Sequence, residues 1–115
     1  MGYKETYNLE QRLAKSRIIL QQYPDRVPVI VEPDKNYKGS LVINQNKFVT
    51  PLDLSIGQLQ NLIRKKTKFP PEKALFLFIN NRIYPLTTLI DTVYKTNKDE
   101  DGFLYVTFCE ESTFG

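Results

Sequence analysis

Apolar residues recur at intervals of three or four in the first part of the chain, which predicts a helical region over residues 1–23. Leu9, Leu13 and Leu20 share this spacing, and Pro24 ends the pattern. Asn8 is a residue type that favours helix N-caps, so we expect the region to divide there into a short helix and a longer one.

A second helix is marked more strongly and is predicted to begin after Ser55. Gln58 stands three residues beyond this serine, which is the spacing of a capping box. Apolar residues then fall on one face, and a cluster of bases lies at the C-terminal end, where the helix dipole favours cations. Pro70 and Pro71 end the segment. A shorter helix is predicted soon after Thr88, which we expect to be its N-cap.

Segments rich in β-branched and aromatic residues predict strands. Pro28 in the first of them favours an edge or a bulge, because proline cannot donate to the ladder. The third segment is apolar at every position, which is typical of a central strand. The predicted strands cover residues 27–32, 47–51, 75–79 and 103–109.

The order of these elements predicts an α+β fold. A hairpin, a crossover helix and a returning strand give a four-stranded mixed sheet with a crossing helix, the ubiquitin-like β-grasp plan, preceded by an N-terminal helical extension. We expect one domain overall, made of the extension at 1–23, the core at 24–109 and a flexible tail at 110–115.

Composition excludes several kinds of chemistry. The chain has 115 residues, enough for one core, and no histidine, which removes Ser-His-Asp and Cys-His catalysis. Its single cysteine, Cys109, allows no internal disulfide and no ordinary tetrahedral zinc site. The glycines are scattered, so no phosphate-binding loop is present. We expect a binding or carrier module of the cytoplasm without metal or cofactor, and neither a membrane span nor a secretory signal.

Charge is distributed unevenly along the chain. Five bases face one acid over residues 64–73, whereas residues 91–115 hold six acids and two lysines. A nucleic-acid-binding module that uses residues 64–68 is therefore one alternative, but no aromatic RNA-binding motif accompanies these bases and the acidic end would repel phosphate. An enzyme that uses Cys109 is disfavoured, because nothing basic adjoins it in sequence to lower its pKa.

Several blocks of sequence resemble, in the same order, the autophagy ubiquitin-like modifiers, the family of the GABARAP and light-chain-three type. The resemblance covers nearly the whole chain and is missing mainly over residues 33–46. The blocks are YPDRVPVIVE at 23–32, DLSIGQ at 53–58, IRK at 63–65, PEKALF at 71–76, DGFLYV at 101–106 and ESTFG at 111–115.

The resemblance implies conjugation of Gly115 to phosphatidylethanolamine on autophagosomes and other vesicle membranes. It also implies four kinds of partner: an activating enzyme, a conjugating enzyme, a processing or deconjugating cysteine protease, and the membrane reached through the lipid anchor. Glycine has no Cβ, so its carbonyl is open to close attack by a nucleophile. Attachment to proteins in place of lipid is an alternative that the same glycine permits.

The resemblance further implies capture of cargo receptors through peptides with an aromatic residue, two spacers and an aliphatic residue. Such a peptide adds a strand to a sheet edge, where pockets for alternate side chains select it. The aromatic pocket matches Ile19, Pro28, Ile30, Lys47, Val49 and Phe103. The aliphatic pocket matches Phe48, Thr50, Pro51, Leu54, Leu59, Leu62 and Ile63, and the charged rim matches Lys15, Arg26, Arg64 and Lys66.

Some of these positions depart from the family pattern. Lys15 stands where an acid is common and Gln45 where a base is common. Thr50 replaces an aliphatic residue, Leu59 an aromatic one and Lys66 an arginine. We expect the departures to alter ligand preference, with Lys15 favouring peptides that carry an acid before the aromatic residue and Thr50 weakening selection for a large aliphatic one.

Overall fold

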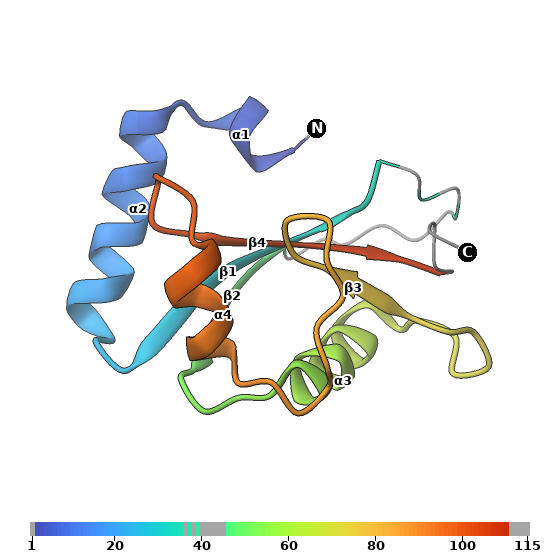
Figure 1. Cartoon of the computed structure of the whole chain (residues 1–115). Coiled ribbons are helices and arrows are strands. Elements are labelled where there is room, and N and C mark those ends of the chain that lie inside the picture. Colours follow the sequence, from blue (N-terminus) through green and yellow to red (C-terminus); the bar gives the residue numbers. More distant parts are fainter. Residues whose placement is uncertain (1, 36, 38, 40–45, 111–115) are drawn as a thin grey trace.

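Four strands and four helices make up the structure, a computed structural model that describes residues 2–35, 37, 39 and 46–110 (Figure 1). The predicted strand at 47–51 and the division of the helical extension near Asn8 are both confirmed. In chain order the elements are α1 (Tyr3–Thr6), α2 (Leu9–Gln22), β1 (Arg26–Pro33), β2 (Lys47–Pro51), α3 (Ile56–Thr67), β3 (Phe76–Phe78), α4 (Ile90–Asn97) and β4 (Leu104–Cys109).

The strands form one mixed sheet in the order β2-β1-β4-β3. β1 is antiparallel to β2, which completes the predicted hairpin, and parallel to β4, while β3 runs antiparallel to β4. The parallel pair lies in the middle because the chain returns to β1 only after α3, β3 and α4. This topology is the predicted ubiquitin-like β-grasp.

Each face of the sheet is covered by helices (Figure 1). Along β1, Val27, Val29 and Val31 belong to a large core that includes residues of α3 and α4. The alternate side chain Ile30 belongs to a smaller core on the other face, beneath α1 and α2. We call Tyr3, Ile19, Ile30 and Phe103 the smaller core; all four are buried.

The two long helices begin where their caps predict. Asn8 accepts a hydrogen bond from the Gln11 amide, and Ser55 accepts one from the Gln58 amide, each within a capping box. α3 ends at Thr67 because Lys68 takes a left-handed conformation with φ 55°, before the prolines are reached.

Three predictions from local sequence were wrong. The strand predicted at 75–79 as central is the edge strand β3, whose apolar character reflects burial and not the number of its neighbours. β1 is an interior strand despite Pro28, which is tolerated because the β4 ladder starts only at Val29. Thr88 does not cap α4; Leu89 holds the N-cap position and the Thr88 carbonyl accepts the Ile56 amide.

Within the described residues, no helix has both the length and the apolar character that crossing a membrane requires. The same residues contain no cluster of histidine, cysteine or carboxylate side chains suited to a metal ion.

Candidate functional site

β2 is an edge of the sheet, since β1 is its only neighbour among the described strands. Its side chains alternate between the two faces: Val49 packs against the smaller core and Phe48 belongs to the large core. A peptide strand added along this edge would point alternate side chains to the two faces of the sheet. The residues on each face could therefore select a different side chain of the peptide.

Residues of the predicted aromatic pocket come together on one face of the sheet. Ile19, Ile30 and Phe103 form part of the smaller core, and Val49 packs against it. Pro28 lies opposite Val49 across the β1–β2 pair, and Lys47 lies opposite Ile30. The six matched positions thus share a face although they come from α2, β1, β2 and the residue before β4.

Two tyrosines that the sequence analysis did not single out also belong to this cluster. The Tyr3 ring lies 5.3 Å from Phe103 in an edge-to-face arrangement and 5.0 Å from the Tyr7 ring. The Lys15 ammonium lies 4.6 Å from the centroid of the Tyr7 ring. This cation–π contact joins Lys15 to a ring that packs against the smaller core, while its place on the rim of a pocket stays a prediction.

Most residues matched to the aliphatic pocket belong to the large core or pack against it, on the opposite face of the sheet. Leu59 and Ile63 have no exposed surface and Phe48 has little, so these three residues are part of the large core. Leu54 and Leu62 are half-buried against the same core and leave part of their surface accessible, and Pro51 is exposed.

Thr50 is nearly fully buried, and its hydroxyl donates to the Val27 carbonyl at 3.4 Å. The hydroxyl is thereby given a partner inside the hairpin, which offsets part of the cost of burying it. Because the hydroxyl is buried and already paired, the expected weakening of selection by Thr50 stays a prediction.

The rim residues differ in how firmly they are held. Arg64 donates to the carbonyls of Pro70 and Lys73, and its guanidinium lies 5.3 Å from the centroid of Phe69. These contacts attach it to the segment after α3. Arg26 and Lys66 are exposed.

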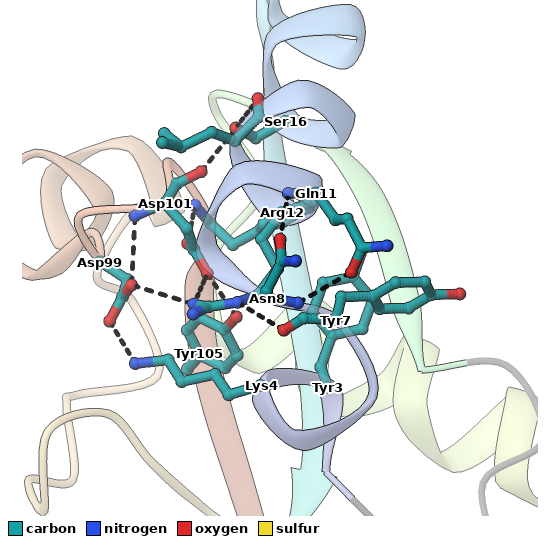
Figure 2. A network of polar contacts seen from close by, with 12 residues as sticks. Tyr3, Lys4, Tyr7, Asn8, Gln11, Arg12, Ser16, Asp99, Asp101 and Tyr105 are labelled. Atoms are coloured by element: carbon teal, nitrogen blue, oxygen red, sulfur yellow. Dashed lines mark hydrogen bonds and ion pairs between the residues drawn. The ribbon is translucent and has the colours of Figure 1, made fainter.

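A buried polar network joins the N-terminal helices to the segment before β4 (Figure 2). Asp101 has no exposed surface; its carboxylate accepts from Arg12 at 2.7 Å, from the Tyr105 hydroxyl at 2.6 Å and from the Phe103 amide at 2.9 Å. The Ser16 hydroxyl donates to the Asp101 carbonyl at 2.5 Å. The hydrogen bond to Asp101 raises the pKa of Arg12, and burial, followed by the bond to Asp101, raises the pKa of Tyr105.

Asp99 extends this network to α1. It accepts from the Lys4 ammonium at 2.5 Å, and Arg12 lies 3.8 Å away (Figure 2). Partial burial acts to raise the pKa of Asp99, but the Lys4 and backbone hydrogen bonds outweigh it and hold the pKa below its usual value. Sequence reasoning missed the network because residues such as Arg12 and Asp101 are 89 positions apart.

Gly115 and the residues from 111 onward lie outside the described residues. Glu110, the last described residue, pairs with the Lys73 ammonium at 3.5 Å. Cys109 is buried at the end of β4, which further disfavours its use as a nucleophile.

Comparison with known proteins places these features in a family. Residues 11–115 match the family model described as autophagy protein Atg8, ubiquitin like. Proteins named autophagy-related protein 8 from Scheffersomyces stipitis and Schizosaccharomyces pombe are 45% and 43% identical to this chain. Each alignment covers 98% of the chain, and 81% and 93% of the respective relative.

Autophagy-related protein 8A from Oryza sativa subsp. japonica is also 45% identical, over 99% of this chain and 95% of its own length. The crystal structure of Trypanosoma brucei ATG8 superposes with a TM-score of 0.89 at 34% identity, covering 100% of this chain and 98% of that one. The resemblance seen in the sequence blocks is thereby confirmed over the whole fold. This chain belongs to the Atg8 family of ubiquitin-like autophagy proteins.

Proposed function

We propose that this protein is a ubiquitin-like modifier that is conjugated through Gly115 to phosphatidylethanolamine on autophagosomal membranes. An activating and a conjugating enzyme would carry it as a thioester, and a cysteine protease would process or release it. It would then move between the cytoplasm and vesicle membranes. Membership of the Atg8 family and the Phe114-Gly115 pair in the sequence support this proposal.

The second part of the proposal is capture of cargo receptors and autophagy factors at β2. The observation that carries it is an edge strand with a cluster of apolar residues on each of its two faces, one under α1 and α2 and one beside α3. An aromatic-x-x-aliphatic peptide would pair with β2 through its backbone and place its two anchors on these clusters.

Conjugation is tested by replacing Gly115 with Ala and incubating the protein with the conjugation enzymes and vesicles. We expect wild type to form a lipid adduct, identified by mass spectrometry on Gly115, and the variant to form none. Omitting the vesicles separates lipid from protein attachment. An adduct on the Gly115→Ala variant, or a wild-type adduct that forms equally without lipid, would contradict lipid conjugation at this residue.

Peptide capture is tested by titrating the protein into a tryptophan-containing peptide and following tryptophan fluorescence. The signal comes from the peptide alone, because this chain has no tryptophan. The half-buried Val49 and Leu62 are suitable positions, since alanine there removes pocket surface and little core. Each change should weaken binding by about 1–3 kcal/mol, the scale of interface hot spots. Leu89→Ala, at an exposed leucine before α4, is the matched control and should not alter the affinity.

The backbone pairing has its own test. Every second residue of an added strand points its backbone N–H at the neighbouring strand. Methylation of those peptide nitrogens should abolish binding, whereas methylation of the nitrogens in between should be tolerated. Equal tolerance at both parities would exclude strand addition at β2.

A further inference from the structure

The predicted tail at 110–115 begins beside β3. The last ladder pair between β3 and β4 joins Phe76 to Cys109, and Glu110 is the next residue along the chain. The Glu110 carboxylate lies 3.5 Å from the ammonium of Lys73, in the segment that leads into β3. The chain bends at Glu110, so the direction in which the tail leaves the sheet is set at the residue that this ion pair holds.

Lys73 is held by its backbone on both sides. Its amide donates to the Pro70 carbonyl at 3.2 Å, and its carbonyl accepts from the Arg64 guanidinium at 3.0 Å. Arg64 also donates to the Pro70 carbonyl at 3.3 Å and lies 5.3 Å from the centroid of the Phe69 ring, which belongs to the large core. The turn that carries Lys73 is therefore attached to α3 and to the core, and the ammonium reaches Glu110 from a fixed backbone.

The ion pair itself is partly exposed. The side chains of Lys73 and Glu110 are 52% and 31% exposed, so water screens their attraction and the pair adds little to the stability of the domain. Glu110 is nevertheless the first residue after the last strand. An enzyme that takes up the tail from this residue onward has to fix its backbone, which costs conformational entropy. A contact that already fixes Glu110 in the free protein reduces that cost.

We propose that the Lys73–Glu110 pair points the tail in the direction in which the activating enzyme takes it up, which makes Lys73 a positioning residue for the reaction at Gly115. This inference rests on the proposed conjugation. The pair acts on binding of the tail and not on the chemical step. It should therefore lower the concentration of this protein at which the enzyme is half-saturated and leave the limiting rate unchanged.

Changes of charge at the two positions test this role. Lys73→Met keeps the apolar stem without the charge, and Glu110→Gln keeps the size of the side chain. Each should raise the half-saturating concentration by about 1.4- to 5-fold, the range for an exposed ion pair. Lys73→Glu places two acids side by side and should raise it further. Combining Lys73→Glu with Glu110→Lys restores opposite charges and should bring the concentration back toward that of wild type.

The assay is the rate of thioester formation on a purified activating enzyme of the Atg8 conjugation system with ATP, over a range of concentrations of this protein. Lys95→Glu is the matched control, because it makes the same change of charge in the exposed Lys95–Asp91 pair on α4, which precedes the other end of β4. It should behave as wild type. Thermal melting shows that each variant is folded. Affinity for a peptide at β2, the opposite edge of the sheet, should stay unchanged.

Two results would overturn the inference while the proposed function stands. If Lys73→Met and Glu110→Gln load at wild-type concentrations, the pair does not orient the tail. If the exchanged pair loads no better than Lys73→Glu alone, the enzyme reads the charge of Lys73 directly and the contact with Glu110 is incidental. Failure of wild type itself to form a thioester would instead refute the proposed conjugation.

Discussion

Lys15 should set the preference of this protein for the residue that precedes a peptide's aromatic anchor. Its ammonium lies 4.6 Å from the centroid of the Tyr7 ring, which packs against the smaller core, and Lys47 lies across from Ile30 on the same face. Among the described residues, Lys15 makes no salt bridge with an acid. Peptides with Asp, Glu or phosphoserine before the aromatic residue should therefore bind more tightly than peptides with Lys or Arg there.

Lys15 is half-buried near the surface, so we take the size of the preference from the range measured for surface ion pairs. An exposed ion pair contributes about 0.2–1 kcal/mol, which corresponds to an affinity ratio of about 1.4 to 5 between an acidic and a neutral peptide. Lys15→Glu replaces attraction by repulsion and should change the ratio by about twice that free energy. Loss of the contact with Tyr7 affects both peptides equally and cancels in the ratio.

The assay is a pair of titrations with peptides that differ only in the residue before the aromatic one, repeated on wild type, Lys15→Met and Lys15→Glu. Lys15→Met keeps the apolar stem on Tyr7 without the charge and should reduce the ratio; Lys15→Glu should reduce it further. Arg17→Glu gives the same change in net charge two residues away on α2, where side chains face differently, and should leave the ratio near that of wild type.

Raising the salt concentration to about 1 M shortens the screening length to about 3 Å and should bring the wild-type ratio close to one. A ratio that is the same in wild type and both Lys15 variants would refute the reasoning. It would mean that Lys15 lies outside the reach of the bound peptide, and its assignment to the rim would have to be abandoned.

Three further predictions concern stability. Ser55→Ala removes the hydrogen bond to the Gln58 amide and should cost about 0.5–2 kcal/mol in urea unfolding; an unchanged free energy would mean the cap is dispensable. Leu59→Ala leaves a cavity at a position with no exposed surface and should cost about 2–5 kcal/mol, whereas a cost near zero would contradict its place in the core. The pKa of Tyr105 is raised in the folded protein, so its neutral hydroxyl adds to the free energy of unfolding below about pH 10, the unfolded pKa. This contribution is lost as the pH rises above that value. Urea midpoints measured from about pH 9 to 11 should therefore fall more steeply in wild type than in Tyr105→Phe, and parallel curves would refute this.

Local sequence was sufficient for the parts of the fold that neighbouring residues control. The capping pairs at Asn8 and Ser55 and the strand at 47–51 could be predicted because each depends on side chains a few positions apart. The left-handed turn at Asn80 and Asn81, with φ of 50° and 64°, follows in the same way from residues that tolerate this conformation. The resemblance to the Atg8 family then assigned residues to pockets that periodicity alone would have described only as core.

Tertiary structure decided what depends on pairing between distant segments. No local pattern shows that β3 lies at the edge of the sheet while Pro28 lies in an interior strand, because strand order is set by which ladders form after the crossover helix. The burial of Asp101 is offset by Arg12 and Tyr105, one of which lies 89 positions away, and so appears only once α2 packs against the residues before β4. The same holds for Tyr3. Its contact with Phe103 forms only when α1 docks on the smaller core, which brings together residues from α2, β1, β2 and the region of β4.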